Sequence, residues 1–504
     1  MTKCIMVQGT MSGVGKSLLT AALCRIFHQD GHRVAPFKSQ NMALNSYITR
    51  EGLEMGRAQV VQALAAGREP DVRMNPILLK PSSDVGSQLI VHGQVRGDYR
   101  AADYFKQKKS LIPEIMAAYH SLCRENDIIV IEGAGSPAEI NLKEDDIVNM
   151  GLAKLVDAPV LLVGDIDRGG VFAQLYGTLA LLEPQERARV VGCVINKFRG
   201  DVTLLEPGLA MLEEKTHVPV LGVVPYAQVD IDDEDSLAPC LEQTACHKPV
   251  DIAVIRLPRL SNFTDFSPLE HHEALGVRYV RQARELGRPD LVILPGTKNT
   301  MEDLLWLRQN GLETAVKHLA ASGTPVLGIC GGYQMLGQTL DDPQGVERRG
   351  TLAGLGLLPC RTVFTPKKTR TRVEGVVEAV PFSGARLEGY EIHMGRTEVA
   401  GEPFCRLSQG QPDGAVQGEV FGTYLHGLFD AGELTDRLAQ WLLARKGMEG
   451  TAVGAESHRD HQERQLDRLA EIVRQSLDLP AIYTAMERSQ KRRGEHDADP
   501  QQAR

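Results

Sequence analysis

Long apolar runs are missing from this 504-residue sequence. No stretch reaches the roughly 18 consecutive apolar residues that a membrane-spanning helix needs. The N-terminus also lacks the basic segment and apolar core of a secretory signal. We therefore expect a protein that is neither secreted nor bound to a membrane, and that works in the cytoplasm.

A surplus of positive charge is missing as well. The chain carries 56 Lys and Arg against 65 Asp and Glu, which gives a formal net charge of -9. Proteins that bind DNA or RNA usually present a basic surface. The charge balance argues against nucleic acid as the main partner.

Closely paired cysteines are the third absence. The nine cysteines are scattered over positions 4, 24, 123, 193, 240, 246, 330, 360 and 405, and none forms Cys-x-x-Cys. Cys240, Cys246 and His247 come nearest to a metal-binding cluster, but no second pair completes it. We expect most of these residues to be reduced thiols in a reducing compartment.

The composition that remains is that of a globular protein, with 42% hydrophobic and 24% charged residues. The length favours about two to four domains. The sequence leaves the oligomeric state open.

The clearest motif is QGTMSGVGKS at Gln8–Ser17. It lies between an apolar run at 4–8, which predicts a buried strand, and the helical spacing of residues 18–27. A glycine-rich turn in this context predicts a phosphate-binding loop for ATP, because its backbone N–H groups and the helix N-terminus attract phosphate. The common spacing would put the first glycine at Thr10, whereas here it is Gly9. The predicted ATP contacts are Gly9, Thr10, Gly13, Gly15, Lys16 and Ser17.

Acidic and amide side chains follow the next predicted strands. Each of three apolar runs is followed directly by a polar residue. Glu132 follows the run at 127–131, Asp165 follows the run at 159–164, and Asn196 follows the run at 190–195. In a parallel sheet these strand ends meet on one edge. We expect Ser17, Glu132 and Asp165 to hold Mg²⁺, and Asn196 to contact the nucleotide. A tight glycine turn with an incidental glutamate is the alternative for Glu132.

Two polar segments are candidates for substrate contact. Lys38, Gln40, Asn41 and Asn45 follow a predicted strand on the side of the phosphate loop, although a solvated loop is an open alternative. Asp146 lies just before an apolar helix start. It either positions substrate or metal, or only stabilises the N-terminus of that helix.

The alternation of strands and helices predicts an α/β protein of two doubly wound domains. The acidic, proline-containing stretch at 226–250 is typical of a linker. We expect a P-loop domain over 1–225 and a second domain over 251–445. Residues 446–504 should form a helical extension followed by a disordered tail from position 488.

A second chemical motif lies in the later half. The run at 325–329 leads into Cys330-Gly-Gly and a helical segment, which predicts a sharp elbow with a thiol at its tip. A helix N-terminus favours the thiolate. His426 ends another predicted strand at 420–425. We expect Cys330 to be a nucleophile and His426 its general base. A buried structural cysteine with a core histidine is the alternative.

Several motifs together resemble the cobyric acid synthase family. They are QGTMSGVGKS, PFKSQNMALNS, EGAGSPAEIN with DIVNMG, GDIDRGGVFA, INKFRGD, GICGGYQMLG and GTYLHGLF, and they run from about position 3 to 426. PFKSQNMALNS and EGAGSPAEIN narrow the match to this family. The first domain is similar to dethiobiotin synthetase, and the second resembles class I, triad-type glutaminases.

The resemblance implies a glutamine-hydrolysing, ATP-dependent amide ligase of cobalamin (vitamin B12) biosynthesis. Cys330 would form a thioester with glutamine, and the backbone of Gly296 and Gly331 would form the oxyanion hole. ATP would phosphorylate the b, d, e and g carboxylates of adenosylcobyrinic acid a,c-diamide in turn, and ammonia would displace phosphate. Triad glutaminases usually carry Glu two residues after the histidine, where this chain has Leu428.

Three other functions are weighed against this one. A MinD/ParA-like ATPase switch would carry a lysine where Met11 stands, and it leaves the second half unexplained. Cobyrinic acid a,c-diamide synthase has the same pair of domains, but PFKSQNMALNS argues against it. A glutamine-dependent ligase acting on a cell-wall or lipid substrate is the third.

Overall fold

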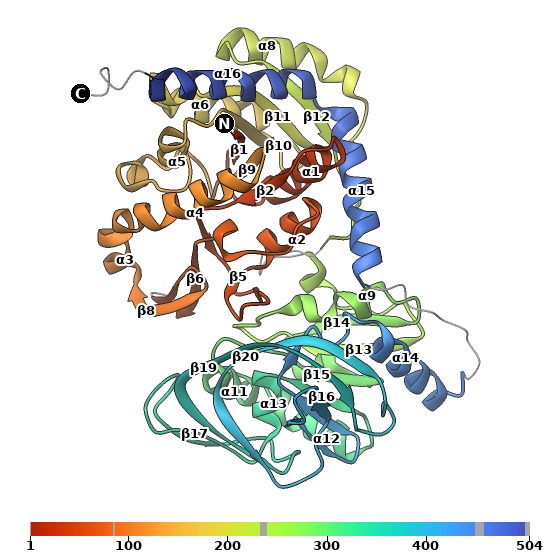
Figure 1. The fold of residues 1–504 in the computed structure, drawn as a ribbon. Helices are drawn as coiled ribbons and strands as arrows, with labels where there is room; N and C mark the ends of the chain where they lie inside the picture. The colour runs from red at the N-terminus through yellow and green to blue at the C-terminus, as the bar shows by residue number, and fades with distance from the viewer. Residues whose placement is uncertain (1, 84–85, 232–238, 449–457, 499–504) are drawn as a thin grey trace. The chain divides into compact units, whose positions relative to one another are not determined.

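The computed structural model describes residues 2–83, 86–231, 239–448 and 458–498. The chain divides into two compact units, which are treated separately. The first comprises Met1–Met42, Met55–Ile231 and Gln462–Arg504, and the second comprises Ala43–Glu54 and Asp232–His461. Segments far apart in the sequence therefore build each unit (Figure 1).

The first unit is organised around a parallel sheet of six strands. Their order across the sheet is β12 (Val220–Pro225), β11 (Val190–Phe198), β10 (Val160–Asp165), β1 (Lys3–Gly9), β9 (Ile128–Glu132) and β2 (Val34–Phe37). The central strands are buried along nearly their whole length, as expected of a parallel sheet covered on both faces. This sheet confirms the doubly wound prediction for the first half.

The helices that complete this unit follow the strands in alternation. They are α1 (Lys16–Gln29), α2 (Arg57–Ala65), α3 (Ala101–Gln107), α4 (Ile112–Glu125), α5 (Met150–Leu155), α6 (Val171–Leu181), α7 (Pro184–Arg187) and α8 (Glu206–Thr216). Short 3-10 turns lie at Val72–Met74, Lys108–Leu111, Ile140–Asp145 and Val202–Leu204. Apolar residues of α1, such as Leu23 and Phe27, are fully buried against the sheet.

The sequence analysis missed a second, smaller sheet in this unit. It has the order β3 (Gln40–Met42), β6 (Ile77–Ser83), β7 (Gly86–Val91) and β8 (Gln94–Arg100). The hairpin between β7 and β8 turns at His92 and Gly93, whose φ angles are 45° and 74°. Positive φ at both positions matches the right-handed twist of the paired strands. Because a histidine fills the first of them, the usual Asn-Gly signal is absent.

The C-terminal helices correct the expected extension. In α15 (His458–Ser476), residues from Gln462 onward belong to the first unit, and α16 (Leu479–Ala498) lies there too, drawn in blue in Figure 1. Val473 and Met486 join the core that surrounds Phe27. The disorder expected from position 488 is wrong for residues 488–498, which continue α16; residues 499–504 lie outside the described part.

The second unit contains the second predicted α/β sheet. Its order is β14 (Leu275–Val280), β13 (Val250–Ile255), β15 (Leu291–Leu294), β16 (Val326–Ile329), β24 (Val420–Thr423) and β23 (Ala415–Gln417). All pairs are parallel except β23 with β24. The helices here are α9 (Ser267–His271), α10 (Ala283–Leu286), α11 (Thr300–Gln309), α12 (Leu312–Ala321), α13 (Gly331–Leu336) and α14 (Glu433–Arg445).

A largely antiparallel sheet, which the sequence analysis did not predict, completes this unit. Its main path is β18 (Gly350–Ala353), β17 (Thr339–Asp342), β19 (Cys360–Val377), β20 (Arg386–Val399) and β25 (Leu425–His426), with β21 (Cys405–Leu407) and β22 (Pro412–Asp413) beside it. The strand β4 (Ser46–Ile48), from the early part of the chain, also belongs to this unit, whereas β5 (Glu54–Gly56) does so only at Glu54. This sheet brings His426 next to Tyr390 of β20.

The linker expected at 226–250 is wrong for its later part. Residues 232–238 lie outside the described residues, but a 3-10 turn occupies Pro239–Glu242 and its Leu241 joins the core of the second unit. The N–H of Tyr279 donates to the carbonyl of Gln243 at 2.8 Å. The second unit therefore begins before the predicted boundary at 251.

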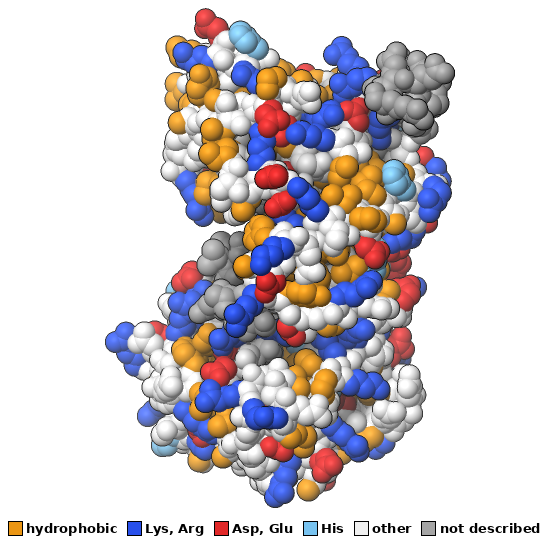
Figure 2. Space-filling view, turned by 90° about the vertical axis from the view of Figure 1, so that its left-hand side faces the viewer, with side chains coloured by type: hydrophobic (Ala, Val, Ile, Leu, Met, Phe, Trp, Pro, Cys, Tyr) orange, Lys and Arg blue, Asp and Glu red, His pale blue; other side chains and the backbone are white. Residues whose placement is uncertain are grey.

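The surface carries charges of both signs, and the described cysteines are unpaired. On the face shown in Figure 2, basic and acidic side chains are interspersed. Among the residues that the structure describes, no helix is both long and apolar enough to cross a membrane. The eight cysteines with described side chains are free thiols, and Cys240 lies outside that set.

Candidate active sites

The loop between β1 and α1 has the backbone of a phosphate cradle. Gly13 and Gly15 have φ angles of 75° and 93°, in the left-handed region that favours glycine. Gly9 is required for a different reason, because a Cβ there would lie 2.5 Å from a methyl group of Val14. The shifted first glycine thus follows from close packing inside this loop.

Lys16 lies over the loop. Its Nζ donates to the carbonyls of Met11 and Gly135, at 3.0 and 3.1 Å. Burial lowers the pKa of Lys16 to about 8, although the charge of Glu132 opposes that effect. An ammonium held by two carbonyls can exchange them for phosphate oxygens at little cost in desolvation.

Glu132, at the end of β9, is the centre of a buried polar network. Its Oε1 accepts hydrogen bonds from Ser17 Oγ at 2.8 Å and from Lys38 Nζ at 2.9 Å, and its Oε2 accepts one from Gln62 Nε2 at 2.5 Å. Burial raises the pKa of this carboxyl, but Lys38 outweighs burial and holds it below the usual range. Ser17 and Glu132 thus lie together as predicted, and they offer the hard oxygen ligands that Mg²⁺ prefers.

Asp165 and Asn196 reach the loop by separate contacts. Asn196 Nδ2 donates to the carbonyl of Val14 at 2.9 Å. Asp165 Oδ2 accepts from Lys197 Nζ at 2.9 Å, and the same amine donates to the carbonyl of Gly13 at 2.6 Å. The structure therefore places Asp165 beside Lys197, a residue that the sequence analysis did not select. The metal role of Asp165 remains a prediction.

The predicted substrate residues do not form one group. Lys38 contacts Glu132, Asn41 Nδ2 donates to Gln59 Oε1 at 2.9 Å, and Gln40 accepts from the hydroxyl of Tyr104. Asn45 lies in Ala43–Glu54, which belongs to the second unit. Lys38 and Asn41 are buried, so a solvated loop does not describe them.

Asp146 accepts three backbone hydrogen bonds. Its Oδ1 accepts from the N–H groups of Val148 and Asn149 at 2.8 Å, and its Oδ2 accepts from that of Gly151 at 2.9 Å. These N–H groups lie at the start of α5 and lack partners within the helix. The contacts favour the stabilising role that the sequence left open beside substrate positioning.

The second site is built on the elbow between β16 and α13. Cys330 has a φ of 51° and a ψ of -107°, which is a strained conformation for a residue with a side chain. Two glycines permit this turn. A Cβ at Gly332 would lie 1.9 Å from the carbonyl oxygen of Leu294, and one at Gly328 would lie 2.7 Å from the backbone of Tyr333. The elbow predicted from the sequence is confirmed.

His426 meets Cys330 at this elbow, since the two side chains are in hydrogen-bonding contact. A buried carboxylate contacts the same ring, with Asp265 Oδ2 lying 2.6 Å from His426 Nδ1. Burial alone would lower the pKa of His426, but Asp265 and Cys330 raise it to about 10. The ring is therefore charged at neutral pH.

Gly296 and Gly331 lie in this site, as predicted. A Cβ at Gly296 would lie 2.9 Å from His426 Cε1, and one at Gly331 would lie 3.1 Å from the amide nitrogen of Thr297. Both glycines therefore pack closely within this site, and their role in an oxyanion hole remains a prediction. Gln334, which the sequence analysis did not select, accepts from Thr300 Oγ1 at 2.9 Å and donates to the hydroxyl of Tyr424 at 3.1 Å.

Asp265 was also missed. It lies 161 residues before His426 in the sequence, within Phe-Thr-Asp-Phe, and this tetrapeptide carries no catalytic signature. The local rule that places a glutamate two residues after the histidine points instead to Leu428, which is buried in the core. Only the fold brings Asp265 to the ring.

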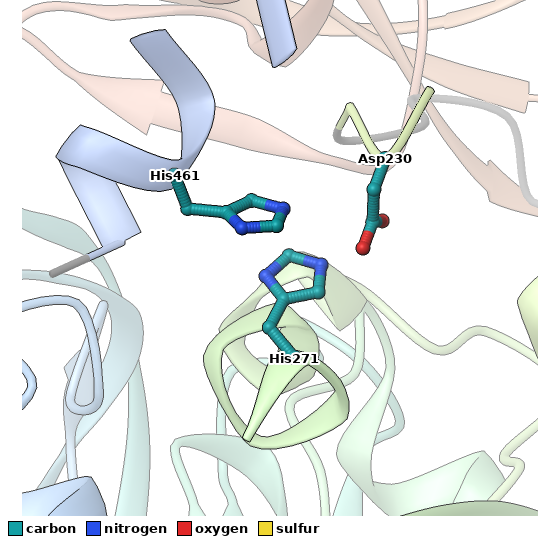
Figure 3. A group of neighbouring side chains, drawn as sticks. All are labelled: Asp230, His271 and His461. Carbon is teal, nitrogen blue, oxygen red and sulfur yellow. The ribbon is translucent and has the colours of Figure 1, made fainter. Parts of the chain in front are cut away.

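Two histidine rings of the second unit are stacked on each other. His271 and His461 stack with ring centroids 4.1 Å apart (Figure 3). Asp230, drawn with them, belongs to the first unit. Two imidazoles fall short of the three or four protein ligands of a typical zinc site, so we describe the pair as an aromatic contact.

Comparison with known proteins separates the remaining alternatives. Residues 5–237 match the model of the CobQ/CobB/MinD/ParA nucleotide binding domain, and residues 251–434 match the CobB/CobQ-like glutamine amidotransferase domain. The cobyric acid synthase of Ruminiclostridium cellulolyticum is 58% identical over 97% of this chain and 98% of its own. The cobyric acid synthase of Streptococcus sanguinis is 54% identical over 97% of this chain and 100% of its own.

The chain belongs to the cobyric acid synthase family. The pairing of a nucleotide-binding domain with a glutamine amidotransferase domain makes it a glutamine-dependent amide ligase that uses ATP. The match confirms the resemblance seen in the motifs, the enzyme class and the α/β fold of both halves. A MinD/ParA-like switch is excluded, because this chain matches a cobyric acid synthase over 97% of its length and carries a glutamine amidotransferase domain besides the nucleotide binding domain.

Asp146→Asn tests the two roles of that residue. Because three backbone bonds depend on the carboxylate, we expect a loss of about 0.5–2 kcal/mol in the free energy of unfolding. The amidation rate of the folded protein should not change. Thermal unfolding and time-resolved mass spectra of the products measure the two effects. Asp145→Asn is the matched control, since Asp145 makes an exposed ion pair with Lys109, and its loss should change neither quantity. Partly amidated products that accumulate at wild-type stability would restore a substrate role for Asp146.

Proposed function

We propose that this enzyme amidates the b, d, e and g carboxylates of adenosylcobyrinic acid a,c-diamide in cobalamin biosynthesis, with glutamine as nitrogen donor and ATP as activator. The observation that supports the proposal is the 50–58% sequence identity to cobyric acid synthases along nearly the whole chain. We propose that the reaction takes place in the cytoplasm, where ATP and glutamine are supplied.

Ammonia is released at the elbow. The Cys330 thiolate attacks the side-chain carbonyl of glutamine, and the oxyanion that forms is stabilised by the backbone at Gly296 and Gly331. The His426 imidazolium gives its proton to the departing ammonia. His426 then takes a proton from the water that hydrolyses the thioester, which releases glutamate and restores the thiolate.

The carboxylate is activated at the phosphate loop. A carboxylate does not condense with ammonia directly, because hydroxide is a poor leaving group. Transfer of the γ-phosphoryl group of ATP gives an acyl phosphate, and ammonia then displaces phosphate to form the amide. Lys16 would stabilise the charge on the transferring group, and Asn196 would hold the loop to the nucleotide. Ser17 and Glu132 would hold Mg²⁺, which when bound neutralises phosphate charge.

Mass spectrometry of the products tests the substrate. Incubation with adenosylcobyrinic acid a,c-diamide, glutamine and ATP should give a product with four new amides. If the chain were instead a cobyrinic acid a,c-diamide synthase, we would expect no reaction with this acceptor and two amidations of cobyrinic acid. That second outcome would overturn the proposed substrate.

The substitution Cys330→Ser should distinguish the glutaminase activity from the amide-forming activity. Without the thiolate, glutamine-dependent amidation should fall on the order of 10³-fold or more. Amidation with a high concentration of ammonium should persist, because the phosphate loop is unchanged. Initial rates with each nitrogen donor measure both activities. Loss of both in a folded variant would contradict the assignment of two separate sites.

Lys16→Ala should have the complementary effect. Both nitrogen donors need the acyl phosphate, so amidation with either should fall roughly 10²–10³-fold. Glutamine hydrolysis by the variant is measured in parallel as a check that the second unit is folded. Ammonia-dependent amidation at the wild-type rate would remove this loop from the ATP site.

A further inference from the structure

We propose that Asp265 is the positioning carboxylate of the glutaminase site, so that Cys330, His426 and Asp265 act together. The inference rests on the proposed glutaminase function of the elbow. It assigns to Asp265 the task that a glutamate two residues after the histidine performs in other triad glutaminases.

Two hydrogen bonds fix Asp265 against His426. Oδ2 lies 2.6 Å from His426 Nδ1, and Oδ1 accepts from the N–H of Gly427 at 2.9 Å. The carboxylate therefore binds both the ring and the backbone just behind it. Only 1% of the His426 side chain and 3% of the Asp265 side chain are exposed, so water does not weaken the contact.

The contact also decides which ring nitrogen carries which proton. An ionised carboxylate can only accept, so Nδ1–H is the donor to Asp265. Because Nδ1 is occupied in this way, the hydrogen bond between Cys330 and His426 uses Nε2. This is the orientation that proton transfer at the thiol requires.

Asp265 lies in a short turn that is anchored in the core. Asn262 has a φ of 53° and leads into the 3-10 turn Phe263–Phe266. Phe263 and Phe266 are buried on both sides of Asp265 and anchor the turn in the core. Asn262 Oδ1 accepts from the N–H of Ser46 at 3.1 Å.

Tyr390 covers one face of the His426 ring. It stacks on His426 with centroids 5.4 Å apart and planes inclined by 24°, and its hydroxyl donates to the carbonyl of Ser46 at 3.0 Å. Ser46 thus contacts both the turn that carries Asp265 and the ring that covers His426. All of these residues belong to the second unit.

The charges around the imidazole agree with this role. The groups that face it are Asp265 from the 3-10 turn, Cys330 from the elbow, and His393 and Tyr390 from β20. Burial lowers the pKa of His393 to about 4, so it is neutral at neutral pH. Asp265 is therefore the fixed negative charge that keeps His426 an imidazolium, and the imidazolium in turn favours the thiolate of Cys330.

Asp265→Asn in the full-length protein tests the inference. Without the carboxylate, only the contact with Cys330 opposes the effect of burial, so the pKa of His426 falls and the imidazolium is less populated at neutral pH. We expect glutaminase activity to fall about 10²–10⁴-fold. The pH of half-maximal alkylation of Cys330 by iodoacetamide, measured by peptide mass spectrometry, should rise by about one unit or more. Ammonia-dependent amidation should not change.

Asp342→Asn is the matched control. Asp342 is also buried, and it accepts four backbone hydrogen bonds from residues 345–348 in the same unit. Its loss should lower stability without moving the alkylation profile. Asp265→Glu is the conservative variant, which should keep the alkylation midpoint close to that of the wild type because it retains the charge.

Two results would overturn the inference. One is an alkylation profile of folded Asp265→Asn that matches the wild type, whatever its activity. The other needs no variant: a wild-type Cys330 with a midpoint near the ordinary thiol value of about 8.5 would show that no imidazolium assists it. Because alkylation requires no substrate, failure of the proposed function would leave this result intact, and the two are distinguished.

Discussion

Both sites depend on one steric constraint, which is the abrupt turn of a buried parallel strand into a helix. At the first site the turn needs space beside Gly9 and positive φ at Gly15. At the second it needs Gly332, where a Cβ would overlap the carbonyl of Leu294. In both places the missing side chains let the backbone approach closely, and the reactive group, Lys16 or Cys330, stands at the helix N-terminus. The constraint thus sets where the chemistry can occur.

Pairing of buried charge decides which side chains surround these turns. A buried carboxylate is costly unless a cation and hydrogen bonds compensate it. Glu132 meets Lys38, Ser17 and Gln62, and Asp265 meets the His426 ring and the N–H of Gly427. In each site the same contacts that stabilise the charge also fix its geometry. A preorganised site of this kind needs little rearrangement during reaction.

The predictions from sequence succeeded where the signal is local. A glycine-rich turn between an apolar strand and a helix needs only about ten residues to be recognised, and both such turns were found. The ends of β9 and β11 brought Glu132 and Asn196 to the loop as predicted, because parallel strands of one sheet end at one edge. Asp146 was ambiguous since a carboxylate before a helix serves capping and catalysis with the same local pattern.

Long-range partners decided the rest. The sequence by itself determined the two α/β sheets, the phosphate loop, the cysteine elbow and the residue types that act there. Only the tertiary structure decided that α16 closes the first unit, that Ala43–Glu54 belongs to the second, and that Asp265 contacts a histidine 161 residues away. A periodic pattern reports which face of an element is buried, but it does not name the element that covers that face. That choice follows from packing and charge pairing over the whole unit.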